Sequence, residues 1–241
     1  MVNTTPSVVS TAECKASSEA FAFCGNKKTM ALPKKTIVYI DGFNLYYGQL
    51  RKTPHKWLDP LKLFQQVLGS QNDIVEIKYF TARVKPTSSN PDIHNRQNAY
   101  FRALQAHCPL VKLHLGHFLR HKVRMENASP PPATWEVWKT EEKGSDVNMA
   151  LHILNDAWLD AYDCAVVVSN DSDLCEALSL VKKHHKNKIV GLVTPGAPER
   201  KTSRQLAEHV DFQRPIRTSA VEASQLPSPI PGTTITKPLS W

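Results

Sequence analysis

The chain has 241 residues, of which 41% are hydrophobic, and its formal net charge is +8. This length and composition predict one sizeable α/β domain with some disordered chain, and the basic surplus suits either a polyanionic partner or simple solubility. No apolar run is as long as a membrane span and no secretory pattern is seen, so we expect no membrane association. The five cysteines are scattered without a CxxC pair, which argues against disulfide frameworks and zinc ribbons and for a cytoplasmic location.

Residues 1–33 are rich in Ser, Thr and Ala and have no useful periodicity, so we expect a disordered extension there. Met30 stands shortly before the first predicted strand. It is therefore a candidate for the working start of the protein.

The first predicted strand, Ile37–Ile40, is apolar and reads as a buried parallel strand. Asp41 falls at its carboxyl end, Gly42 permits a sharp turn, and a helix is predicted from about Asn44. Ligands bind at the carboxyl ends of strands in open α/β sheets. Asp41 is therefore a candidate site residue, although capping the following helix would equally explain an acid there.

Helices and strands then alternate. A helix is predicted from Asp59-Pro60 to Gly69, a strand over Val75–Tyr79, a helix over Asp92–His107 and a strand over Leu110–Leu115. Arg96 in the second helix could reach a phosphate, or could simply belong to a solvated helix face.

The most basic local stretch is His117–Met125, and a short edge strand is predicted around Trp135 and Trp138. Tryptophans beside basic residues could stack bases, or they could cover the edge of a sheet. We favour edge covering for the tryptophans. Phosphate binding is assigned to the three basic side chains of this stretch, Arg120, Lys122 and Arg124.

More acids come later in the chain. Asp146 lies in the first turn of an amphipathic helix, where its charge also suits the helix dipole. The buried strand Cys164–Val168 runs into Ser169-Asn170-Asp171-Ser172-Asp173. Two acids at this second strand end are harder to explain by capping than one.

The last ordered elements are a strand over Lys188–Thr194 and a short helix over Ser203–Phe212. From Gln213 onward the chain is rich in Pro, Ser and Thr. This composition predicts a disordered tail over residues 213–241.

Alternating strands and helices predict a five-stranded, mainly parallel sheet, and in the order 3-2-1-4-5 strands one and four are neighbours. Asp41, Asp171 and Asp173 would then meet in one crevice, and Asp146 would reach it from the helix before strand four. Clustered carboxylates need cations, and hard oxygen ligands favour Mg²⁺ or Mn²⁺ over zinc.

Three motifs carry a resemblance to a known family: Asp41-Gly42-Phe43-Asn44 after the first strand, Lys143-Gly144-Ser145-Asp146, and Ser169-Asn170-Asp171-Ser172-Asp173. In this order and on these elements they make the chain resemble the NYN domains, a branch of the PIN-like nucleases, and among them the LabA-like bacterial group. The resemblance covers residues 34–212. It implies a three-layer PIN-like Rossmannoid domain.

The resemblance also implies metal-dependent cleavage of RNA, single-stranded RNA being the expected substrate. By position, Asp41, Asp146, Asp171 and Asp173 match the metal-binding acids, and Asn44 matches the polar partner of the first acid. Asn44, Ser169 and Asn170 are expected to position these groups or to contact the substrate. Asn170 stands where bacterial members commonly have glycine, a small departure because asparagine tolerates unusual backbone angles.

Two other functions fit parts of the pattern. An NYN fold can bind RNA or a protein without cutting, since a fold does not prove an activity. Asp171-Ser172-Asp173 also suggests a phosphatase of the haloacid dehalogenase type. That type places its paired acids on the first strand with a threonine two positions on, whereas Cys175 holds that position here. Oligomeric state and protein partners stay open.

Overall fold

The computed structural model describes residues 32–88, 90–196 and 202–241. The predictions for residues 1–31, including the start at Met30, therefore lie outside the described residues. One compact unit runs from Leu32 to Trp241. Within these described ranges, no helix is both long enough and apolar enough to cross a membrane.

The strands are β1 (Lys34–Asp41), β2 (Asn72–Ala82), β3 (Val111–Glu126), β4 (Thr134–Lys143), β5 (Cys164–Val168), β6 (Ile189–Thr194) and β7 (Phe212–Pro215). The helical elements are α1 (Gly42–Leu45), the π-helix η1 (Tyr46–Leu50), α2 (Pro60–Leu68), α3 (Ile93–His107), α4 (Ser145–Trp158), the 3₁₀ turn η2 (Ser172–Leu174), α5 (Cys175–His184), α6 (Arg204–Ala207) and α7 (Thr218–Ala223).

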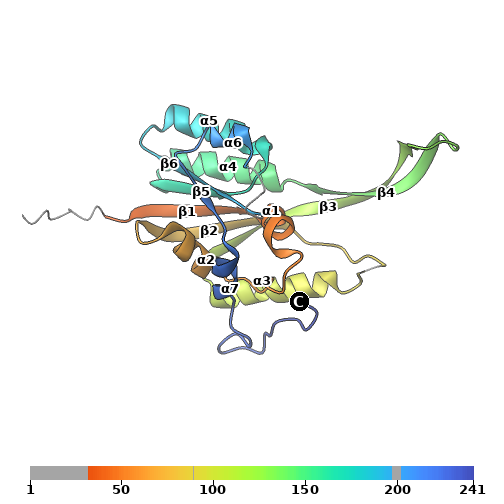
Figure 1. Ribbon diagram of the computed structural model, residues 1–241, viewed down its shortest axis with the longest axis horizontal. Helices are drawn as coiled ribbons and strands as arrows, with labels where there is room; N and C mark the ends of the chain where they lie inside the picture. The colour runs from red at the N-terminus through yellow and green to blue at the C-terminus, as the bar shows by residue number, and fades with distance from the viewer. Residues whose placement is uncertain (1–31, 89, 197–201) are drawn as a thin grey trace, which may run out of the picture. The chain divides into compact units, whose positions relative to one another are not determined.

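The seven strands form one sheet in the order β4-β3-β2-β1-β5-β6-β7, and every pairing is parallel except that of β3 with β4. Helices α2, α3 and α7 cover one face, and α4, α5 and α6 cover the other (Figure 1). Successive side chains of β1 point to opposite faces of the sheet and pack into two hydrophobic cores. Val38 and Ile40 belong to one buried cluster, and Ile37 and Tyr39 belong to the other. The predicted α/β three-layer class is confirmed.

The five predicted strands keep their predicted order, but the sheet has two further strands at its edges. β4 is longer than the short strand predicted around the tryptophans. It pairs antiparallel with an extension of β3 from His117 to Glu126. β7 was missed because its four residues end in a proline and carry little apolar signal.

The C-terminal segment is ordered, so the prediction of disorder over residues 213–241 is wrong. Ile216, Val221, Leu226 and Ile230 are buried in the core on the α2–α3 side of the sheet. Their spacing fits no continuous helix or strand, because only Val221 lies in a helix, the short α7, and the other three lie in irregular chain. Sequence periodicity could not detect this mode of packing.

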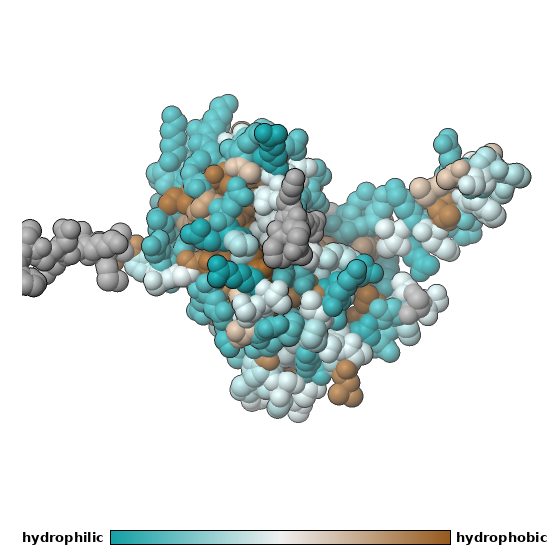
Figure 2. Space-filling view, in the orientation of Figure 1, coloured by the Kyte–Doolittle hydropathy of each residue, from teal (hydrophilic) through white to brown (hydrophobic). Residues whose placement is uncertain are grey.

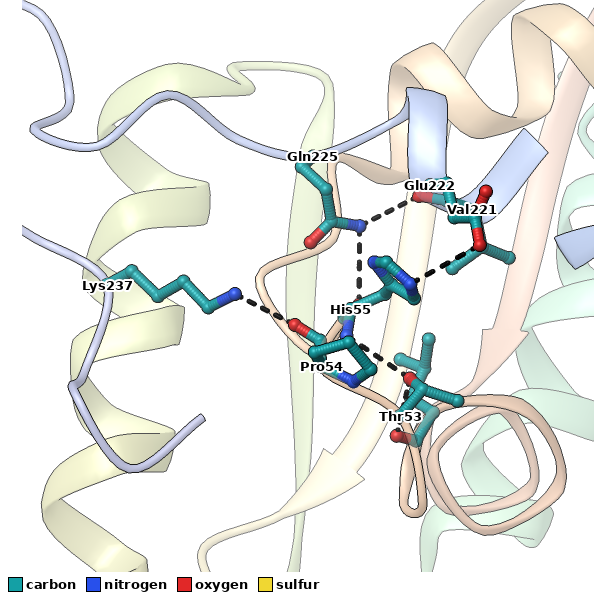
Figure 3. Close-up of polar contacts among 8 residues, drawn as sticks. Thr53, Pro54, His55, Val221, Glu222, Gln225 and Lys237 are labelled. Carbon is teal, nitrogen blue, oxygen red and sulfur yellow. Dashed lines mark hydrogen bonds and ion pairs between the residues drawn. The ribbon is translucent and has the colours of Figure 1, made fainter. Parts of the chain in front are cut away.

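Polar contacts tie the same segment to the loop before α2 (Figure 3). The Gln225 side chain donates to the carbonyl of His55 at 3.3 Å, and Lys237 Nζ donates to the carbonyl of Pro54 at 2.8 Å. The indole nitrogen of Trp57, itself buried, donates to the carbonyl of Pro227 at 3.1 Å. The C-terminal segment is therefore an integral part of the domain.

Candidate metal centre at the strand ends

Acidic side chains from four elements line one cavity of about 260 Å³. Asp41 ends β1, Asp171 follows β5, Asp146 lies in the first turn of α4, and Glu142 lies near the end of β4. β1 and β5 are direct neighbours in the sheet, which brings the first two acids together as predicted. The other lining residues are Phe43, Asn44, Tyr47 and Phe118.

Asp41 is only 6% exposed and is held by donors on both carboxylate oxygens. Oδ1 accepts a hydrogen bond from the backbone N–H of Asn44 at 2.8 Å, and Oδ2 accepts one from the hydroxyl of Ser169 at 3.0 Å. Burial raises the pKa of Asp41, and these hydrogen bonds act in the opposite direction. The capping explanation thus holds, but it uses only one of the two oxygens.

Ser169 links the two strand ends. Its buried hydroxyl donates to Asp41 and accepts from the backbone N–H of Asp171 at 3.1 Å. This single side chain therefore joins the carboxylate of Asp41 to the backbone of Asp171.

Asp146 shares its surroundings with several other carboxylates. Burial raises the pKa of Asp146 to about 6, and the charges of Asp41, Asp171, Glu142 and Asp173 act in the same direction. Like charges this close are unfavourable without a compensating cation.

Glu142 is an acidic cavity residue that the sequence did not reveal. Its Oε1 accepts from the hydroxyl of Ser145 at 2.7 Å and from the backbone N–H of Ser145 at 3.2 Å. It reaches the cavity because β4 pairs with β3 so that Glu142 lies opposite Phe118. Only that cross-strand register, which sequence periodicity does not give, could have pointed to it.

Asp173 and Asn170 do not line this cavity. Asp173 is exposed, and its backbone N–H donates to Asp171 Oδ1 at 3.0 Å, so its charge acts on the site from outside. The side-chain oxygen of Asn170 accepts from the backbone N–H of Ser203 at 2.7 Å, which ties the loop after β5 to the start of α6.

The donor set fits a hard divalent cation. The acids offer only oxygen ligands, and Asn44 Oδ1 is buried without a hydrogen-bond partner in the described structure. A cation would both offset the clustered charge and satisfy that oxygen. Mg²⁺ keeps several of its waters when it binds to proteins, so not every acid of the cavity has to contact it directly.

A second group of possible ligands lies at the start of α2 and the end of α3. The ligand atoms of Asp59, His107 and Cys108 lie within 4.8 Å of one another, and in the described ranges no other such group is that tight. However, Asp59 Oδ1 already accepts from the backbone N–H of Lys62 at 3.1 Å, capping α2. Burial and Asp59 raise the pKa of Cys108 to about 12, so the thiol keeps its proton and is a poor ligand.

The basic residues of β3 lie on one face of the β3–β4 hairpin, the ribbon that extends beyond the helices (Figure 1). Arg120, Lys122 and Arg124 alternate along β3 and therefore share that face. Phe118 precedes them on the same face and lines the acidic cavity. A basic track therefore leads from the cavity along the hairpin, which is largely hydrophilic in the view of Figure 2.

The tryptophans do not cover an edge, so that interpretation is wrong. Trp135 is 55% exposed and Trp138 is 57% exposed on the outermost strand of the sheet. The guanidinium of Arg120 lies 4.8 Å from the centre of the Trp138 ring, and Lys122 Nζ lies 5.6 Å from it. Trp138 is thus available on the basic face as a stacking surface.

Arg96 is separated from this hairpin. It lies on α3 and lines a second cavity of about 330 Å³, which is rich in aromatic residues. Phe43 and Tyr47 line both cavities, so one aromatic wall divides them.

Comparison with known proteins agrees with the three motifs. The profile of the NYN domain matches residues 35–215. The chain belongs to the NYN domain family. It is also 34% identical over 242 aligned positions to the 6-hydroxy-3-succinoylpyridine 3-monooxygenase HspA of Pseudomonas putida (strain DSM 28022 / S16), covering 89% of this chain and 78% of HspA.

Among solved structures, this NYN protein is similar to VPA0982 from Vibrio parahaemolyticus RIMD 2210633, a protein of unknown function. The TM-score is 0.48 at 19% identity, covering 78% of this chain and 95% of that one. The predicted NYN and PIN-like assignment is confirmed by the domain match. The finer LabA-like assignment stays a prediction.

The raised pKa of Asp146 predicts a pH dependence. The ordinary pKa of an Asp side chain is 3.8, and that of Asp146 in the folded protein is about 6. At pH values between the two, Asp146 keeps its proton in the folded protein, whereas the unfolded chain has released it. Stability of the metal-free protein should therefore fall as pH rises through this window, and Asp146→Asn should flatten the change. Urea unfolding between pH 4 and 7 measures it. If stability fell equally steeply with pH in the Asp146→Asn variant, Asp146 would not be the cause of the pH dependence.

Proposed function

We propose that this NYN domain is a Mg²⁺- or Mn²⁺-dependent ribonuclease that hydrolyses phosphodiester bonds at the acidic cavity. The observation that carries the proposal is the Asp41–Ser169–Asp171 arrangement, in which one buried hydroxyl contacts the carboxylate of Asp41 and the backbone N–H of Asp171 at a cavity that Asp146 also lines. A structural cap would require neither the shared serine nor the additional acids.

Asp41 and Asp171 are the proposed direct ligands. Asp146 would bind directly or through water, or would orient the attacking water, and exposed Asp173 would act through water. Glu142 and the unpartnered oxygen of Asn44 add further oxygen donors. A bound divalent ion would lower the pKa of a water and stabilise charge on the departing oxygen.

The basic face of the hairpin is the proposed path for the substrate. Arg120, Lys122 and Arg124 would contact successive phosphates, and exposed Trp138 would stack a base of a single strand. Lys122 is shared with Glu136, whose carboxylate lies 2.6 Å from its ammonium, so Arg120 and Arg124 are the freer phosphate donors.

Cleavage of mixed single-stranded and structured RNAs tests the proposal. Products should appear with Mg²⁺ or Mn²⁺ and disappear with excess EDTA, because carboxylates alone cannot stabilise a negative phosphoryl transition state. Full activity in EDTA would contradict the metal dependence. Inactivity on varied RNA and DNA with bound metal demonstrated would favour a binding module without catalysis.

Replacing Arg120, Lys122 and Arg124 together by Ala should weaken RNA binding and reduce the slope of log affinity against log salt. Each lost phosphate contact lowers the slope by about 0.7 for a single strand. Triple replacement of Lys62, Lys183 and Lys186, exposed lysines on α2, on α5 and just after α5, is the matched control. Equal salt slopes for the hairpin variant and wild type would show that this face does not bind phosphates and is only solvated surface.

A second candidate is turnover of a small aromatic compound. The NYN protein is 34% identical to a relative named as a monooxygenase of 6-hydroxy-3-succinoylpyridine. In the NYN protein itself, an aromatic cavity adjoins the acidic cavity. Incubation with that pyridine, O₂ and a reduced nicotinamide tests this candidate. Loss of the pyridine in step with oxidation of the nicotinamide would favour it over RNA cleavage.

A further inference from the structure

We infer that the cavity beside the metal centre, formed between η1 and α3, binds a planar aromatic ring that carries an anionic group. The inference concerns binding alone and does not depend on the hydrolysis proposed above. Its ligand would lie against the aromatic wall shared with the acidic cavity.

The walls of this cavity are built for a flat ring. Tyr46 and Tyr47 approach it from η1, Tyr100 from α3, and Trp241 from the C-terminal segment. Tyr100 and Trp241 pack edge to face with ring centres 5.8 Å apart, and the hydroxyl of Tyr100 is fixed by the carbonyl of Leu58 at 2.9 Å. Rigid rings at several angles favour stacking and edge contacts with an aromatic ligand.

The charged side chains that line this cavity are all positive. Arg51, Lys56 and Arg96 line it, and no Asp or Glu of the described chain does. Burial raises the pKa of Tyr46, and the charges of Arg51 and Arg96 act against this shift, so both guanidiniums exert an electrostatic effect on the phenol. Arg96 gives one N–H group to Asn90, and its planar fork retains other donors for an anion.

The backbone at this place is also unusual. Residues Tyr46–Leu50 form a π-helix, and the backbone N–H of Arg51 donates to the carbonyl of Tyr46 at 2.8 Å. Single π-turns are rare and frequently occur at functional sites. The extra residue in this turn presents Tyr46, Tyr47 and Leu50 together to the cavity.

Two sources could supply such a ligand, a nucleotide or a small aromatic carboxylate. Calorimetric titrations in EDTA with adenosine and uridine 5′-monophosphates and with pyridine-3-carboxylate distinguish them, because EDTA removes any contribution of a metal at the acidic cavity. Adenosine, uridine and pyridine-3-carboxamide are the neutral controls. At least one class of anion should bind saturably and about tenfold more tightly than its neutral partner.

Arg96→Gln should lower the affinity for that anion about tenfold and leave the neutral analogue unchanged. Arg102→Gln is the matched control, since Arg102 is exposed on the same helix and does not line the cavity. Binding by nucleotides alone would assign the cavity to a base of the substrate strand, and binding by the carboxylate alone to a metabolite. The inference is overturned if neither anion binds, if neutral rings bind equally well, or if both arginine variants behave alike.

Discussion

Replacing Asp171 by Asn is expected to stabilise the metal-free protein and to abolish cleavage. The charge of Asp171 raises the pKa of both Asp41 and Asp146, so neutralising it removes repulsion in a partly buried cluster. A gain of roughly 1 kcal/mol corresponds to about 2–4 °C in melting temperature for a chain of this size. Loss of a ligand should lower cleavage at least about a hundredfold.

The expected gain in stability and loss of cleavage distinguish two roles of Asp171, metal ligand and helix cap. Asp171 Oδ1 accepts from the backbone N–H of Asp173 at 3.0 Å, and asparagine caps about as well as aspartate. A capping role alone therefore predicts unchanged stability, metal response and cleavage. Scanning fluorimetry with and without Mn²⁺, beside one cleavage assay, makes the comparison, and exposed Asp73→Asn is the control. Mn²⁺ should stabilise the Asp171→Asn variant much less than wild type.

Removing the chain after Pro215 is expected to prevent cooperative folding, although the NYN match ends at that residue. The deletion takes away Ile216, Val221, Leu226 and Ile230, all buried. Each buried aliphatic side chain contributes about 1.5–3 kcal/mol, and the sum is comparable with the total stability of about 5–15 kcal/mol of a typical domain. Thermal melting followed by circular dichroism measures the loss.

Point variants keep this second prediction testable if the truncated chain is insoluble. Leu226→Ala should cost about 2–5 kcal/mol because Leu226 is 4% exposed. Fully exposed Leu239→Ala, in the same segment, should cost almost nothing. A truncated protein with the wild-type melting curve, or equal curves for the two point variants, would show that the segment is not part of the core.

The parts of the fold that could be predicted are those with a simple period. Cys164–Val168 is buried on both faces and reads as a continuous apolar run, while the apolar residues of α2 recur at helical spacing. Connection rules then gave the order of five strands. The β3–β4 hairpin was underestimated because its residues are exposed on both faces, so burial imposes no clear alternation.

The same division holds for the site. Asp41, Asp146 and Asp171 could be predicted because each follows a recognisable strand end or helix start, and all three line the cavity. Glu142 depends on the register of a long hairpin. The aromatic cavity depends on a π-turn and on Trp241, which lies far from α3 in the sequence. These long-range pairings leave no local pattern.

Anomalous X-ray scattering from crystals grown with Mn²⁺ tests the central claim most directly. We expect an anomalous peak between Asp41, Asp146 and Asp171, which should be absent from crystals of the Asp171→Asn variant grown under the same conditions. The group formed by Asp59, His107 and Cys108 provides an internal comparison. A peak at that group with none at the acidic cavity, or a peak that persists at the cavity unchanged in Asp171→Asn, would contradict a metal centre held by these acids.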